Sequence, residues 1–218
     1  MEQRHNQDKH SLLFIIILGM LTAIGPLAID MFLPGLPELK NDFNTTTANA
    51  QLTLSFFMIG LGIGNLFVGP ISDSVGRKKP LIIVMTIFTL ASLGIIFVHN
   101  IWLMIILRLL QGITGGGAAV ISRAIASDLY KGNELTKFLS LLMLVNGVAP
   151  VIAPALGGII LSVAVWRVVF VILTIFGILM IMGSLTKIPE SLSLEYRDSS
   201  GIKVIFQNFK SLLGTPRF

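Results

Sequence analysis

The chain has 218 residues, no cysteine, a formal net charge of +5 and a mean hydropathy of +0.86. Hydrophobic residues make up 54% of it and charged residues only 12%, whereas charged residues are about a quarter of an ordinary soluble domain. This composition excludes a water-soluble globular domain, and the missing cysteines exclude a disulfide framework or a thiolate metal cluster.

Residues 1–10 form a polar tail, and six apolar segments follow it. Each segment is close to the roughly 20 residues that span a bilayer. Within residues 11–186 we place them at 11–33, 48–71, 80–98, 101–125, 138–163 and 166–186. The sequence therefore predicts an all-α integral membrane protein built as a bundle of six transmembrane helices.

Lysine and arginine are distributed unevenly between the two predicted sides. All of them fall on one side except Lys40 and Arg167, on the other, and Arg108, inside a segment. Short cytoplasmic loops retain Lys and Arg, so both termini are predicted to be cytoplasmic. Topology then explains the positive charge, with membrane lipid as the surroundings and no nucleic-acid partner.

The first segment carries an acid, Asp30, and Pro37 marks its outer end. At 1.5 Å per residue the acid lies about 10 Å below that end. A charge inside a span is costly and marks a candidate functional site. The alternative is an ordinary solvated charge at the helix end.

The second segment contains Gly60 and Gly64, whose spacing of four predicts that another helix packs closely here. Asn65 follows, and it either lines a cavity or forms a hydrogen bond to another helix. The third segment, 80–98, is uniformly apolar, so we expect it at the lipid-facing periphery.

The stretch 69–79, between the second and third segments, reads as a short charged hairpin. Gly69, Pro70 and Gly76 suit a turn. Asp73 and Arg77 are four residues apart, so they can pair with each other and cap neighbouring helix ends. We expect a cytoplasmic gating latch, with a plain positive-inside anchor as the alternative. Its candidate residues are Gly69, Asp73, Gly76, Arg77 and Lys78.

The fourth segment carries Arg108 and Gln111, followed by Gly115–Gly117. It runs from outside to inside, so Arg108 lies about 10 Å from the outer surface, the depth estimated for Asp30. An arginine at this depth needs a partner or a water-filled cavity. The alternative is that its side chain snorkels to the outer interface.

The fifth segment contains Asn146 and then Pro150, Pro154, Gly157 and Gly158. Two prolines four apart remove hydrogen bonds from one helix face and predict a kink or hinge. Asn146 is a further candidate for the cavity.

After the sixth segment, which opens with Trp166 and Arg167, residues 187–218 read as a polar cytoplasmic linker. Within it, residues 202–213 have the pattern of an amphipathic helix lying along the inner membrane surface. The alternative is a disordered linker.

Together these motifs resemble the amino-terminal half of major facilitator superfamily drug:proton antiporters of the bicyclomycin- and chloramphenicol-resistance (Bcr/CflA) type. The residues that carry the resemblance are Asp30 with Leu33–Pro37, Gln51–Ser55, the stretch 69–79, Arg108–Gly112, Ala149–Gly158 and Trp166–Arg167. The chain departs from the pattern at Ser74, Asn65 and Ser127.

The resemblance implies one six-helix half of a twelve-helix fold, itself two inverted three-helix repeats. It implies export of a small lipophilic drug or antibiotic across the bacterial inner membrane by alternating access, driven by protons and without a cofactor or metal. Asp30 would exchange the proton, tuned by Arg108 with Gln111. Asp73 and Arg77 would latch the cytoplasmic side, and the prolines would bend the fifth helix.

The chain ends in what reads as the middle loop, before a seventh helix. We therefore expect it to need a missing C-terminal half. Two alternatives remain, a homodimeric six-helix carrier that uses a second copy and an inactive truncated product. An enzyme is not expected, because the spans hold no His–Glu metal pattern and no Ser or Asp dyad.

Overall fold

The computed structural model describes residues 12–197, which form six long helices and three short ones. The tail 1–10 and the expected helix at 202–213 lie outside the described residues. The elements are α2 (Leu12–Asp30), η1 (Leu33–Gly35), α3 (Leu36–Asp42), α4 (Thr47–Val75), α5 (Lys78–Ile96), α6 (Ile101–Leu129), α7 (Gly132–Val163), α8 (Arg167–Lys187) and η2 (Leu194–Tyr196).

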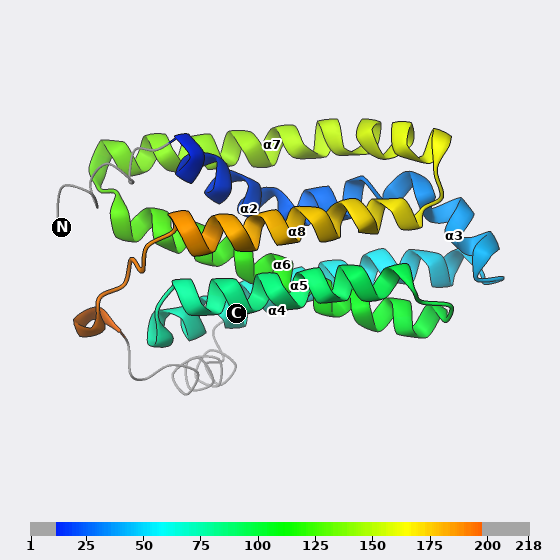
Figure 1. The fold of residues 1–218 in the computed structure, drawn as a ribbon, viewed down its shortest axis with the longest axis horizontal. Helices are drawn as coiled ribbons and strands as arrows, with labels where there is room; N and C mark the ends of the chain where they lie inside the picture. The colour runs from blue at the N-terminus through cyan, green and yellow to red at the C-terminus, as the bar shows by residue number, and fades with distance from the viewer. Residues whose placement is uncertain (1–11, 198–218) are drawn as a thin grey trace, which may run out of the picture.

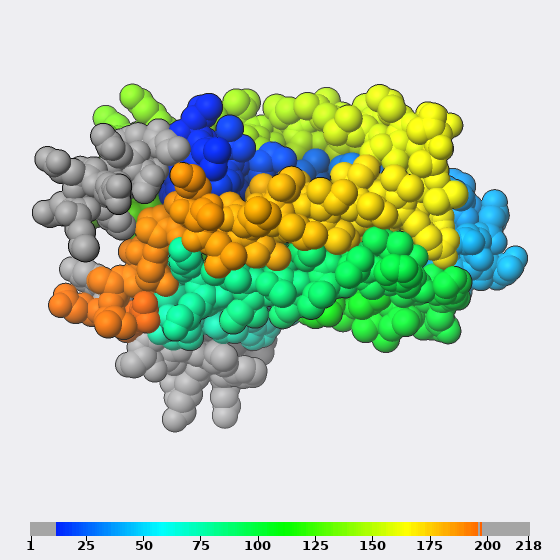
Figure 2. Space-filling model, in the orientation of Figure 1, coloured from blue at the N-terminus to red at the C-terminus, as the bar shows by residue number. Residues whose placement is uncertain are grey.

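Six helices are long and apolar enough to cross a membrane, with α2 and α3 together making the first span. The predicted all-α architecture with six spans is confirmed. The helices run side by side along the long axis of the bundle (Figures 1 and 2). α6 contacts α2, α4 and α5, and α7 packs mainly on α2. We call the two ends the α3 end and the turn end, the latter holding the α4–α5 turn.

Local capping explains where α4 and α6 begin. The Thr46 hydroxyl accepts a hydrogen bond from the Asn49 backbone N–H at 3.2 Å, and the Asn100 side chain accepts one from Trp102 N–H at 2.8 Å. α4 ends at Gly76, whose φ of 103° suits glycine.

The expected hairpin over 69–79 is shorter in the structure. Gly69 and Pro70 lie inside α4, and only Gly76 and Arg77 separate α4 from α5. The placement of Gly69 and Pro70 in a turn was therefore wrong. Apolar residues continue around them, and an apolar environment favours helix because every backbone group must be satisfied within the chain.

Glycines bring α4 and α6 into backbone contact, which confirms the predicted close approach. A Cβ added at Gly60 would overlap Leu109 O, and one added at Gly64 would overlap Ile113 O. The reverse holds for Gly112 of α6, where a Cβ would overlap Phe57 O. The two helices therefore pack through their main chains.

The third span is more than a lipid-facing surface. α5 packs against both α8 and α6, and its Phe88 and Ser92 are fully buried. The expectation of a peripheral helix was therefore incomplete. A uniformly apolar stretch does not indicate which of its faces contacts protein and which contacts lipid.

α7 continues as one helix through Pro150 and Pro154, and Figure 1 shows it running along the bundle without interruption. Most of its surface is exposed, because its contacts are mainly with α2 and η1. The predicted hinge stays a prediction, since neither proline breaks the helix.

Candidate functional site

Asp30 is the last residue of α2, at a break inside the first span. Met31 N–H still donates to Leu27 O at 3.2 Å, after which the chain forms η1 and α3 (Figure 1). The Asp30 side chain is half-buried, and no described residue forms a hydrogen bond or ion pair with it. The acid therefore stands at a helix end inside the span, and its carboxyl group is unpaired among the described residues.

Arg108 lies fully buried beside this break. Its Nη1 donates to Ala28 O at 3.1 Å and to Gln111 Oε1 at 2.8 Å. The Gln111 amide in turn donates to the Ser92 hydroxyl at 2.7 Å. With 0% of Arg108 exposed, the structure does not support snorkelling to the interface.

Aromatic rings surround the Arg108 guanidinium. Its central carbon lies 4.4 Å from the ring centre of Phe57, 5.0 Å from that of Phe32 and 5.6 Å from that of Phe170. Cation–π attraction stabilises a cation in this setting. Nε and Nη2 have no hydrogen-bond partner among the described residues, and no described carboxylate forms an ion pair with Arg108. We call Arg108, Gln111 and these three rings the aromatic cage.

The cage explains how a broken helix is tolerated inside the bundle. The last carbonyls of a helix lack partners, and Arg108 supplies one to Ala28, two residues before Asp30. A cation at a helix C-terminus also complements the helix dipole. The structure thus brings Arg108 and Gln111 to the α2 terminus, but Gln111 bonds to Ser92 rather than towards Asp30.

The two asparagines predicted for the cavity lie apart from the cage. Asn65 is exposed on α4, and its Oδ1 accepts a hydrogen bond from Arg123 of α6 at 2.8 Å. Asn146 of α7 donates to Leu142 O within its own helix at 3.0 Å. Of the two alternatives for Asn65, the hydrogen bond between helices is observed.

A second buried arginine, Arg77, lies at the turn end with 6% of its surface exposed. Nη1 lies 2.5 Å from Asp73 Oδ1, and Nε donates to Asp128 Oδ2 at 2.9 Å. Burial alone would lower the pKa of Arg77, but hydrogen bonds and charge from Asp128 and Asp73 outweigh it and raise this pKa. The guanidinium therefore stays charged, bonded to two carboxylates.

Glu190, from the segment after α8, ties this cluster to the sixth span. Its carboxylate accepts hydrogen bonds from the backbone N–H groups of Arg77 at 2.7 Å and Lys78 at 3.3 Å. Ser191 donates to Asp128 at 2.8 Å, and the Lys78 ammonium donates to Leu185 O at 2.9 Å. We call Asp73, Arg77, Asp128, Glu190 and Ser191 the turn-end cluster.

Sequence reasoning found the Asp73–Arg77 pair but missed the roles of Asp128, Glu190 and Ser191. Glu190 lies 113 residues from Arg77, in a stretch that reads as an ordinary polar linker. The chain alone carries no signal that joins the two positions.

The proline- and glycine-rich motif of α7 also touches the break in the first span. A Cβ at Gly157 would overlap Met31 O, so α7 packs directly against the residue after Asp30. At Gly158 an added Cβ would meet nothing within 4 Å, and Pro150 is exposed.

At the α3 end, Trp166 and Arg167, at the start of α8, link α3 to the end of α5 and the connection that follows it. Arg167 forms an ion pair with Asp42 and donates to the carbonyls of Ile96 and Val98, each at 3.1 Å. Trp166 donates through its backbone to Glu38 and through its indole to Asp42, both at 3.0 Å. We call this arrangement the clasp, formed by Glu38, Asp42, Trp166 and Arg167.

A bundle of six membrane-length helices with a broken first span and buried arginines has the architecture of half a membrane transporter. The chain belongs to the Major Facilitator Superfamily, whose family profile matches residues 18–218. It is a family of transporters, so the expectation that the chain is not an enzyme is confirmed. No His/Cys/Asp/Glu group suited to a metal occurs in the described part of the chain.

Two bacterial relatives show which members of the family the chain is similar to. The chain is 42% identical to the uncharacterized MFS-type transporter YdgK of Bacillus subtilis, over 98% of this chain and 54% of the relative. It is 32% identical to the bicyclomycin resistance protein homolog of Haemophilus influenzae, over 94% of this chain and 51% of that protein.

Multidrug resistance protein D of Escherichia coli is 26% identical over 94% of this chain and 51% of its own length. Among solved structures, the human organic anion transporter MFSD10 superposes with a TM-score of 0.67 at 16% identity, over 89% of this chain and 51% of its own. That likeness concerns the fold. The chain spans about half the length of the curated relatives it matches.

Proposed function

We propose that this chain forms the amino-terminal half of a proton-coupled exporter of small lipophilic drugs in a bacterial inner membrane. The observation that supports it is the unpaired carboxyl group of Asp30 at a helix break, two residues after the Ala28 carbonyl that binds the buried Arg108. An ionisable group inside a span that can exchange a proton is what coupling requires. The names of the bacterial relatives support export of drugs as the transport reaction.

In this proposal Asp30 carries the proton and Arg108 holds the α2 terminus while the charge of Asp30 changes. The turn-end cluster faces the cytoplasm, in keeping with the charge of the loops, and holds that side closed in one state. Its bonds connect α4, α5, α6 and the segment after α8, so opening there moves these elements together.

A second set of six helices completes the carrier. The support is the largely exposed face of α7, where Val151 is 76% exposed and an added Cβ at Gly147 or Gly158 would meet open space. Such gaps let another helix approach closely.

The test is energised efflux of fluorescent drugs from exporter-deficient bacteria. The chain is expressed alone and together with the second half of the Bacillus subtilis relative, each with and without Asp30→Asn. Glu134→Gln, at an exposed carboxylate in the first turn of α7, is the matched control.

With both halves expressed, we expect drug efflux. An uncoupler and Asp30→Asn should each abolish this efflux, and Glu134→Gln should leave it intact. Efflux driven by a pH gradient in the Asp30→Asn variant would remove Asp30 from coupling. Absence of efflux with both halves in the membrane would contradict drug export.

A further inference from the structure

A cavity of about 370 Å³ lies at the α3 end, between the broken first span and the start of α4. It is distinct from the aromatic cage, and neither Asp30 nor Arg108 lines it. Its lining includes Leu33, Leu36, Pro37, Lys40, Thr47 and Gln51. The wall from the first span thus carries apolar residues and the Lys40 cation, and the wall from α4 carries a hydroxyl and an amide.

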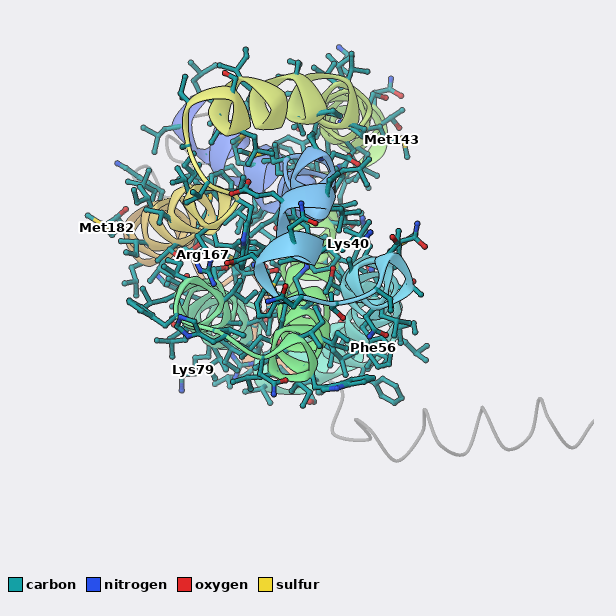
Figure 3. The ribbon with its side chains drawn as sticks, turned by 90° about the vertical axis from the view of Figure 1, so that its right-hand side faces the viewer. Lys40, Phe56, Lys79, Met143, Arg167 and Met182 are labelled. Atoms are coloured by element: carbon teal, nitrogen blue, oxygen red, sulfur yellow. The ribbon has the colours of Figure 1, made fainter. Side chains whose placement is uncertain are left out.

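The clasp leaves the charge of Lys40 without a counter-charge. Glu38 and Asp42 are four residues apart on one face of α3, and both bond to Trp166 or Arg167. Lys40 lies midway between them in sequence and so on the opposite face, at about 200° around the helix. Figure 3 shows Arg167 and Lys40 on either side of α3. No described acid forms an ion pair with Lys40.

The polar groups of this cavity point to a ligand with acceptor atoms. Within residues 12–197 no hydrogen bond engages the side-chain amide of Gln51, which is exposed on α4. Leu33 is 44% exposed, and it lies beside the half-buried Leu36. The Lys40 cation and the Gln51 amide, with the apolar side chains of the first span beside them, match an anionic head group joined to an apolar body.

We propose that this cavity binds amphiphilic anions, with the anionic group on Lys40 and Gln51 and the apolar part against Leu33 and Leu36. The ligand could come from two sources that share this chemistry, an acidic lipophilic drug or an anionic phospholipid. The site goes beyond proton coupling, because Asp30 is not part of it.

The cysteine-free sequence gives a direct test. Leu33→Cys places one thiol in the cavity wall, and its rate of reaction with N-ethylmaleimide is measured on the purified 218-residue chain in phosphatidylcholine vesicles. We expect decanoate to slow this reaction and decyltrimethylammonium, the cation of equal chain length, to leave it unchanged.

Adding Lys40→Gln should raise the decanoate concentration that gives half-protection about tenfold, the loss of one charge-assisted contact. Lys40→Arg should preserve protection, and Lys79→Gln, at an exposed lysine of the turn end, should have no effect. Val151→Cys, on the exposed face of α7, controls for general partition of decanoate into the membrane.

A second arm distinguishes the two sources. Phosphatidylglycerol added to the vesicles should by itself protect Leu33→Cys, in a Lys40-dependent way, if phospholipid occupies the site. If only decanoate protects, the site takes free anions.

Equal protection by decanoate and the matched cation, or protection unchanged by Lys40→Gln, would overturn the proposal. The same protection is measured with Asp30→Asn and should not change. A failure of drug efflux is thereby separated from a failure of this site.

Discussion

The two buried arginines of this bundle are accommodated in opposite ways. Arg77, with 6% of its surface exposed, is held by two carboxylates, whereas Arg108, with 0% exposed, contacts a carbonyl, an amide and three aromatic rings. Burial of a cation is therefore a poor guide to its role. At the turn end the charges compensate one another and link segments, whereas in the aromatic cage no described carboxylate neutralises the positive charge of Arg108.

The largest effect is expected from removing the compensated arginine. Arg77→Met leaves the half-buried Asp128 without its cation, and breaking a buried pair costs up to about 3–5 kcal/mol in the free energy of unfolding. Thermal and detergent unfolding followed by tryptophan fluorescence measures this loss. Lys79→Met, an exposed lysine two residues away, is the control. A loss no larger than that of Lys79→Met would show that the turn-end cluster contributes little.

Removing the uncompensated arginine should behave differently. Arg108→Met deletes a desolvated charge together with two unpaired donors and fills the cage with an apolar chain. We expect a smaller loss in the free energy of unfolding, about 1–3 kcal/mol, because Ala28 O and Gln111 Oε1 lose a donor but no carboxylate is left unpaired. Drug efflux in the two-half assay should nevertheless be lost. A destabilisation as large as that of Arg77→Met would erase the distinction between the two regions.

The smallest effect concerns the exposed partner in the turn-end cluster. The Asp73 side chain is 49% exposed, whereas that of Asp128 is 17% exposed. Asp73→Asn should therefore cost about 0.2–1 kcal/mol, the range of exposed ion pairs, and the cost should shrink as salt rises. Asp128→Asn in the same unfolding assay gives the comparison. Equal losses in the two variants would mean that both carboxylates act as buried partners.

What the sequence could predict follows from how local each signal is. Six apolar stretches of membrane length predicted the spans, and charges within apolar runs singled out Asp30 and Arg108. The pairing of Asp73 with Arg77 followed from one helical turn of spacing.

Contacts between distant segments could not be found in this way. The bond from Gln111 to Ser92 joins two spans, and nothing distinguishes Ser92 from other small residues of an apolar stretch. Phe32, Phe57 and Phe170 form the cage from the turn before η1, from α4 and from α8, although each reads as an ordinary core residue. Gly69 and Pro70 suit a turn locally, yet the apolar surroundings keep both in a helix.

The clasp has a consequence for biosynthesis. Asp42 and Arg167 are separated by 125 residues, and Glu38 and Trp166 by 128. At about 5–20 residues per second, the ribosome needs on the order of 6–25 seconds to deliver that partner after Asp42 is made. During this interval the clasp cannot form, because Glu38 and Asp42 do not yet have Trp166 and Arg167 as partners. Closure of the clasp therefore follows translation of the first five spans.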